Sequence, residues 1–153
     1  MTYVLGSRSL QRLEGVHPDL VRVVKRAIAL SEQDFMVLEG VRTVARQHEL
    51  YGQGRTAAQC RAAGVDPRYA KPGPQVTWTL KSNHFAGRAV DLVPWPIDWN
   101  DLKKFDAISR AMFAAAEELG VGIRWGADWD EDGTKRERGE SDSPHFELDK
   151  DHP

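Results

Sequence analysis

The chain has 153 residues, of which 41% are hydrophobic and 29% are charged, and its formal net charge is −2. These values are typical of one soluble globular domain with a single core. The small net charge gives no basic surface for nucleic acid and no attraction to anionic lipid. The one cysteine, Cys60, cannot form an internal disulfide. We therefore expect a single domain over residues 1–153, monomeric, that binds neither nucleic acid nor membrane.

The first 30 residues do not have the composition of a leader or an anchor. Their most apolar segment, VRVVKRAIAL, is interrupted by Arg22, Lys25 and Arg26. A signal peptide needs an apolar stretch of about 7–15 residues, and a membrane span needs about 20. We therefore expect synthesis in the cytoplasm, with no secretion signal and no membrane span.

Hydrophobic periodicity, capping residues and turn residues divide the chain into helices, strands and loops. The expected elements are helices over about 18–28, 43–51, 56–63 and 102–119, and strands over 35–40, 88–93, 121–126 and 144–148. A proline-rich loop (65–79) and a charged loop (130–141) lie between some of them. Helices precede and separate the strands without the regular alternation of a parallel sheet. We therefore expect an α+β fold with a small antiparallel sheet flanked by helices.

The segment SNHFAGRAVD (82–91) places chemically active side chains around a turn of small residues. If Ala86 and Gly87 form a two-residue hairpin turn, Ser82 faces Asp91. Because side chains alternate along strands, His84 would then lie on the same face as both. Taken alone, this pattern is more often a polar surface hairpin than two-thirds of a metal site.

A second segment, SDSPHFE (141–147), supplies a further donor. His145 on a strand could complete a set with His84 and Asp91 that leaves a fourth position open, as in catalytic zinc sites. Asp142 would be the nearby carboxylate that takes a proton from zinc-bound water. The helical HExxH motif of many zinc peptidases is absent.

Three segments together resemble the LAS-type zinc peptidases. SNHFAGRAVD matches the S-x-H-x-x-G-x-A-x-D motif of that family. WGADW (125–129) followed by DSPHFE is similar to its W-G-[GA]-D-W and D/E-x-x-H-F motifs, and EGVRT (39–43) resembles its arginine segment. The segments occur in family order and span residues 39–147. The family includes D-Ala-D-Ala peptidases and the L-alanyl-D-glutamate endolysins of phages.

The resemblance implies a LAS/hedgehog-like fold, one Zn²⁺ ion and a set of site residues. The implied residues are the zinc ligands His84, Asp91 and His145, the general base Asp142, the oxyanion-stabilising Arg42, and the substrate contacts Ser82 and Gln47. Val41 and Glu39 depart from the family pattern beside Arg42. These departures bear on how the substrate fits the site more than on the catalytic mechanism.

The resemblance also implies hydrolysis of peptide bonds in the stem peptides of bacterial peptidoglycan. The small chain, the aspartate base and the missing signal sequence resemble the endolysin branch, which cuts the L-alanyl-D-glutamate bond. Such an enzyme would leave the host cytoplasm through a holin pore, and the absence of a separate wall-binding domain would suit a Gram-negative host. Two alternatives stay open: a D-Ala-D-Ala carboxypeptidase or dipeptidase, and a non-catalytic zinc-containing binding module, which would need neither Asp142 nor Arg42.

Other polar residues have ordinary explanations at this stage. His17 is expected at an exposed helix entry and His152 in a frayed tail, neither of them as a metal ligand. His48 is expected on a helix surface, and Asp128 in a structural hydrogen bond. Glu147 either supports His145 from the same strand face or is simply exposed.

The tryptophans and the charged loop complete the expectations. Trp125 and Trp129 should pack near the site, whereas Trp95 and Trp99 should take part in ordinary packing. Residues 130–141 are expected as a solvated loop, with a lid or a regulatory ion site as the alternative.

Overall fold

The computed structural model describes residues 2–77, 80, 87–128, 130–131, 133–136 and 142–153. The chain forms two compact units. The sheet unit comprises Met1–Val41 and Ala86–Pro153, and the helical unit comprises Arg42–Phe85. The predicted hairpin turn at Ala86 lies outside the described residues.

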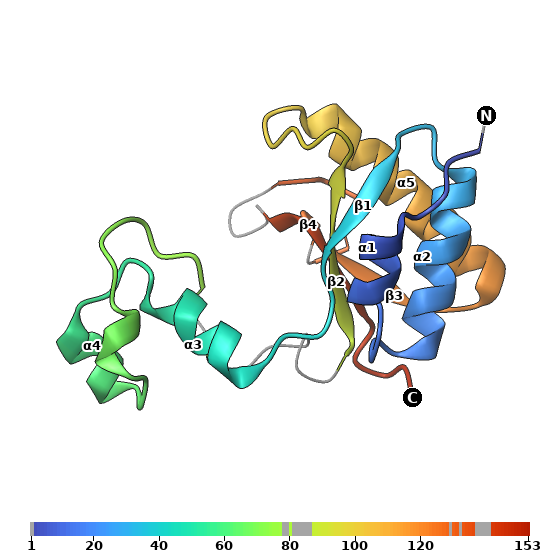
Figure 1. Cartoon of the computed structure of the whole chain (residues 1–153). Coiled ribbons are helices and arrows are strands. Elements are labelled where there is room, and N and C mark those ends of the chain that lie inside the picture. The colour runs from blue at the N-terminus through green and yellow to red at the C-terminus, as the bar shows by residue number, and fades with distance from the viewer. Residues whose placement is uncertain (1, 78–79, 81–86, 129, 132, 137–141) are drawn as a thin grey trace. The chain divides into compact units, whose positions relative to one another are not determined.

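Four antiparallel strands build the sheet of the sheet unit, in the order β1-β2-β4-β3 (Figure 1). The strands are β1 (Phe35–Glu39), β2 (Ala89–Pro94), β3 (Ile123–Gly126) and β4 (Asp142–Leu148). The two central strands, β2 and β4, therefore have a neighbour on each side. This sheet confirms the expected α+β class, and each strand overlaps its predicted range.

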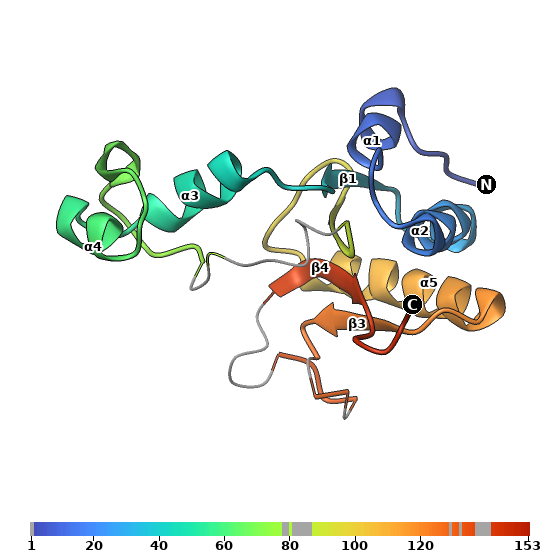
Figure 2. The ribbon, with the colours of Figure 1, turned by 90° about the horizontal axis from the view of Figure 1, so that it is seen from below.

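Three helices belong to the same unit: α1 (Ser7–Arg12), α2 (Pro18–Leu30) and α5 (Leu102–Leu119). The long helices α2 and α5 lie side by side in both views (Figures 1 and 2). Pro18 starts α2, as predicted, because a first-turn proline loses no helical hydrogen bond. Gly120 ends α5 with φ of 69°, a left-handed conformation that glycine adopts without strain.

Alternation along the strands separates an apolar face from a polar one. Val90 and Leu92 on β2, and Phe146 and Leu148 on β4, belong to the core that α2 and α5 help to form. Because successive side chains point to opposite faces, the residues between them point away from that core. The pattern that builds the core thus places Asp91 and His145 on the opposite face, where Ala89 and Val93 are apolar and also buried.

The helical unit contains α3 (Val44–Gly52), α4 (Ala57–Ala62) and the short 3-10 helix η1 (Pro67–Tyr69). Thr43 caps α3 by accepting from the backbone N–H of Arg46, and Thr56 forms a reciprocal capping box with Gln59 at the start of α4. The sequence predicted the first helix from its N-cap threonine and the second from the glycine, Gly64, that follows it. The 3-10 turn was not predicted, because a single turn within a proline-rich loop has too few residues to show periodicity.

Two further expectations are corrected. Helix α1 was not predicted, and it depends on tertiary packing: Ser9 is buried, and its Oγ accepts from the N–H of Val37 on β1 at 3.0 Å. Trp95 and Trp99 are each 53% exposed, so ordinary packing describes them only in part, although the Trp99 ring stacks on Phe105.

Among the described residues, no helix is both long and apolar enough to cross a bilayer.

Adjacent residues on α5 test the assignment of the core. Met112 is fully buried, whereas Phe113 is 39% exposed. Met112→Ala should lower the free energy of unfolding by about 2–5 kcal/mol, because it removes buried methylenes and leaves a cavity. Phe113→Ala, the matched control on the same helix, should cost well below that. Urea titration measures both, and equal losses would contradict the packing of α5 described here.

Candidate active site and metal centre

Asp91 and His145 face each other across the central strands. The register of β2 and β4 pairs these two residues directly. Nδ1 of His145 lies 3.3 Å from Oδ1 of Asp91, and the side chains are only 11% and 16% exposed. Strand pairing therefore brings together two of the three expected zinc ligands; the third, His84, lies outside the described residues.

Glu147 holds the other nitrogen of the same ring. Its Oε1 lies 2.8 Å from Nε2 of His145, and the residue is only 6% exposed. Arg124 on the neighbouring strand lies 3.7 Å from Oε2 of Glu147. If Nε2 donates its proton to this carboxylate, Nδ1, which faces Asp91, is the ring nitrogen left to bind a metal ion. Support of His145 is thus the role the structure favours for Glu147, and the alternative of simple exposure is wrong.

Asp142, the expected base, begins β4. Its Oδ2 lies 3.8 Å from Nδ1 of His145, and its side chain is 53% exposed. It pairs with Gly126, where a Cβ atom would lie 2.2 Å from the backbone oxygen of Asp142. Only glycine permits this approach, which explains the glycine in the WGADW segment. Asp142 therefore combines access to solvent with proximity to the nitrogen that faces Asp91.

The charges around His145 favour a cation at this position. Burial lowers the pKa of the imidazole, but hydrogen bonds with Asp91 and Glu147, together with the charge of Asp142, outweigh burial and raise it to about 9. Carboxylates and an imidazole are donors that zinc binds, and a zinc-ligating histidine typically donates its second N–H to a carboxylate. The residues present therefore fit a divalent metal ion between Nδ1 and the carboxylate of Asp91.

The start of β4 is anchored by the segment before it. Trp125 is buried, and its Nε1 donates to the backbone oxygen of Ser143 at 2.7 Å. Arg136 donates to Oγ of Ser143 at 3.1 Å and to Oδ1 of Asp106 at 2.9 Å. Trp125 thus packs beside the site as expected, and the expected solvated loop is wrong at Arg136, which is fixed to the sheet unit.

Asp128 and Trp129 belong to the same segment. Oδ2 of Asp128 accepts from the backbone N–H of Gly133 at 3.1 Å, which is the structural hydrogen bond expected for it. Trp129 lies outside the described residues.

Within the helical unit, Gln47 orients Arg42. Oε1 of Gln47 accepts from the guanidinium of Arg42 at 2.7 Å, and Nε2 donates to Oγ1 of Thr77 at 3.3 Å. Gln47 is fully buried. The sequence resemblance placed Gln47 near the substrate, whereas its observed contacts are with these two side chains. Ser82, the other expected substrate contact, lies outside the described residues.

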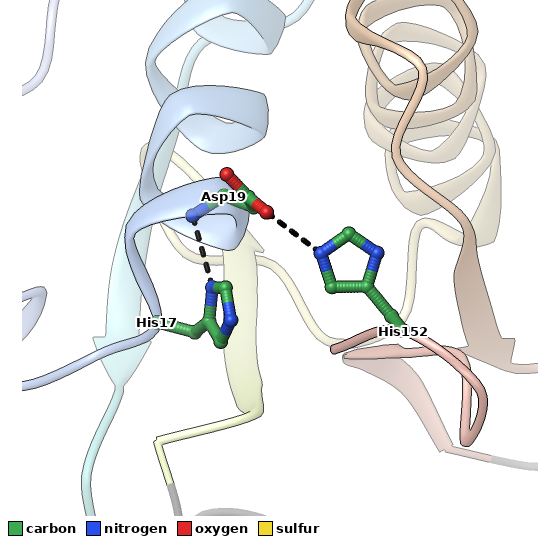
Figure 3. A group of neighbouring side chains, drawn as sticks. All are labelled: His17, Asp19 and His152. Atoms are coloured by element: carbon green, nitrogen blue, oxygen red, sulfur yellow. Dashed lines mark hydrogen bonds and ion pairs between the residues drawn. The ribbon is translucent and has the colours of Figure 1, made fainter.

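A second group of donors was missed by the sequence analysis. His17, Asp19 and His152 could hold a metal ion, because each offers one ligand atom and these atoms all lie within 4.8 Å of one another (Figure 3). The tail around His152 is not frayed at this residue, whose side chain is only 14% exposed. Hydrogen bonds with His152 and Arg22 lower the pKa of Asp19. No local pattern could reveal a pairing of two distant segments of the chain.

Comparison with known proteins agrees with the fold and the motifs. The sequence model of the family described as phage L-alanyl-D-glutamate peptidase matches residues 1–64 and 69–149. The chain is similar to the L-alanyl-D-glutamate peptidase of Escherichia phage T5, with 35% identity over 154 residues that cover 97% of this chain and 99% of that protein. It is also similar to the crystal structure of the Serratia marcescens L-Ala D-Glu endopeptidase ChiX, with a TM-score of 0.68 and 33% identity, covering 95% of this chain and 90% of the other. The chain belongs to the phage L-alanyl-D-glutamate peptidase family.

Proposed function

We propose that this chain hydrolyses the bond between L-alanine and D-glutamate in peptidoglycan stem peptides, using zinc bound by His84, Asp91 and His145. The observation that carries the proposal is the largely buried Asp91–His145 pair, in which Nδ1 of His145 faces the carboxylate of Asp91 and Nε2 contacts that of Glu147. Family membership supports the choice of bond. The family motif alone supports His84 as the third ligand.

When bound at such a donor set, zinc would act as a Lewis acid that polarises a carbonyl group, and it would lower the pKa of bound water toward neutral pH. Asp91 and His145 would bind the zinc ion together with His84. Three protein ligands would leave a fourth coordination position open. Glu147 is a positioning residue, because its carboxylate fixes the tautomer of His145 and the direction of Nδ1. Since Glu147 is buried against His145, it is poorly placed to exchange protons with substrate.

Asp142 is the proposed general base. It accepts a proton from the attacking water and passes that proton to the leaving amine of D-glutamate, which balances the hydrolysis. Its exposure and its 3.8 Å distance from Nδ1 of His145 support this role, because the base must reach both solvent water and the reacting centre.

Arg42 is the proposed oxyanion stabiliser. A guanidinium keeps its charge and offers a directional fork of donors to the carbonyl oxygen as negative charge develops there. Gln47 acts through Arg42, since its buried amide oxygen accepts from that guanidinium. Ser82 is the proposed substrate contact, on the strength of the family motif alone.

We assign one catalytic domain to the whole chain, 1–153, acting as a monomer, because the family model matches residues 1–64 and 69–149. The family places the action of such peptidases on the bacterial cell wall. Synthesis in the host cytoplasm and release through a holin pore are the proposed route to that wall.

Digestion of purified sacculi tests the proposed bond directly. The zinc-loaded chain should release peptides with a new N-terminal D-glutamate and leave L-alanine on the muramyl group. Mass spectrometry of the products, before and after labelling of free amines, identifies the new terminus. Free D-alanine or D-Ala-D-Ala as the sole product would overturn the endopeptidase assignment without touching the zinc ligands.

Asp142→Ala should separate catalysis from metal binding. The variant should retain zinc and its unfolding midpoint but lose at least about two orders of magnitude in kcat, as expected for a missing general base. Glu117→Ala, an exposed carboxylate on α5, is the control and should keep full activity. Activity close to wild type in the Asp142 variant would remove this residue from the mechanism.

Glu147→Ala should weaken zinc binding although Glu147 is not a proposed ligand. Loss of the acceptor for Nε2–H should lower zinc affinity by about 10–100-fold, because the ring orientation and tautomer are no longer fixed. Competition with a chelator measures the affinity. Glu147→Gln keeps an acceptor oxygen and should recover part of the loss; zinc affinity unchanged in both variants would contradict the positioning role.

A further inference from the structure

We propose that His17, Asp19 and His152 form a second metal site in the sheet unit, for a transition-metal ion such as Zn²⁺ or Ni²⁺. These residues are distinct from the proposed active-site ligands. Two imidazoles and one carboxylate are donors that such ions bind well. The site would join the start of α2 to the segment that follows β4.

The distances suit a single ion after small side-chain movements. Nε2 of His152 lies 2.7 Å from Oδ2 of Asp19, and the His17 and His152 rings meet edge to face with centroids 5.4 Å apart. All three donor atoms lie within 4.8 Å of one another. Ligands about 2.0–2.2 Å from an ion are separated by roughly 3.5 Å in a tetrahedron, so modest side-chain rotations would close the set.

The hydrogen bonds of His17 identify Nδ1 as the nitrogen that would bind the ion once its present hydrogen bond is broken. Nδ1 accepts from the backbone N–H of Asp19 at 3.1 Å, and Nε2 lies 2.9 Å from the backbone oxygen of Pro153. Nε2 therefore carries the proton, and Nδ1 is unprotonated and faces the backbone N–H of Asp19 (Figure 3). A ring that donates one N–H to a backbone carbonyl and binds metal through the other nitrogen is a common arrangement in metal sites. The ion would displace the Asp19 N–H from Nδ1, and it would replace the proton shared by His152 and Asp19, which is released to solvent.

The two segments are already fixed before any ion binds. Arg88 at the start of β2 donates to the backbone oxygens of Asp149 and His152 at 2.8 and 2.9 Å. On the other side, the backbone N–H of His17 donates to the oxygen of Gly87 at 2.8 Å. Both histidines are thus tied to adjacent residues of one chain segment, which reduces the entropy that metal binding would otherwise lose.

Competing charges make the proposed site weaker than the active site. Arg22 pairs with Oδ1 of Asp19 at 2.8 Å, and the N-terminal end of α2 carries partial positive charge. Both disfavour a cation. Removal of Arg22 should therefore strengthen metal binding, an effect that a purely structural role for the histidines does not predict.

Calorimetric titration of the zinc-loaded, active enzyme with Ni²⁺ tests the proposal. Wild type should bind one equivalent beyond the active-site zinc. His17→Asn keeps a capping acceptor for α2, and His152→Gln keeps a donor to Asp19, so both variants should fold. Each should lose at least about tenfold in affinity for that equivalent, since removal of a group that merely supports a ligand already costs about 10–100-fold. Arg22→Gln should bind more tightly.

The controls separate this proposal from the proposed function. His48→Asn removes a histidine of the helical unit and should leave the second equivalent unchanged. All four variants should hydrolyse sacculi at the wild-type rate. Absence of a second equivalent in wild type, or its persistence in the His17→Asn/His152→Gln double variant, would overturn the second site. Loss of hydrolysis in the double variant would show that His17, Asp19 and His152 serve the active site, and this too would overturn the second site. A product other than the expected one from wild type would overturn only the proposed function.

Discussion

The pairing of β2 with β4 sets Asp91 opposite His145, and the core on the other face of the sheet holds that register in place. A slip of one residue would turn every side chain of one strand to the opposite face. Phe146 would then leave the core and His145 would enter it, burying a charged group among apolar ones. Each hydrophobic contact of Val90 and Phe146 therefore also maintains the distance between two proposed metal ligands.

His145 and His17 are held in a similar way at one ring nitrogen. Each ring has one nitrogen bound to an oxygen acceptor, Glu147 in one case and the backbone of Pro153 in the other. The remaining nitrogen of His145 faces the carboxylate of Asp91, whereas that of His17 accepts from the backbone N–H of Asp19. Buried or partly buried carboxylates are costly unless a cation or a hydrogen-bond donor compensates them. The difference lies in the surroundings, because Arg22 already compensates Asp19, whereas three carboxylates surround His145.

Periodicity and caps predicted most helices and strands because those signals are local, as with Thr43, Gly64 and Gly120. The motif also selected Asp91, His145 and Asp142, which the sheet places together. What the sequence could not reveal depends on burial or on distant partners. The sequence left Glu147 open between support of His145 and exposure, and only its burial decides between them. The contact of Gln47 with Arg42, and the place of His152 beside the start of α2, were not visible in the sequence. Helix α1 belongs to the same class, since its Ser9 needs Val37.

The helical unit interrupts the sheet unit between β1 and β2, so neighbouring strands of one sheet are separated by a long intervening segment. Pairing of β1 with β2 closes a large loop. The chain loses conformational entropy on closing that loop before the contacts between the strands can offset the loss. Non-local strand pairing of this kind slows folding, whereas the turns within α2 and within α5 join residues close in sequence and can form early. Asp91 and His145 meet only after the central strands have paired. The proposed metal-binding pair is thus among the last features to assemble, and a chain trapped before that step would be compact and helical but without this pair.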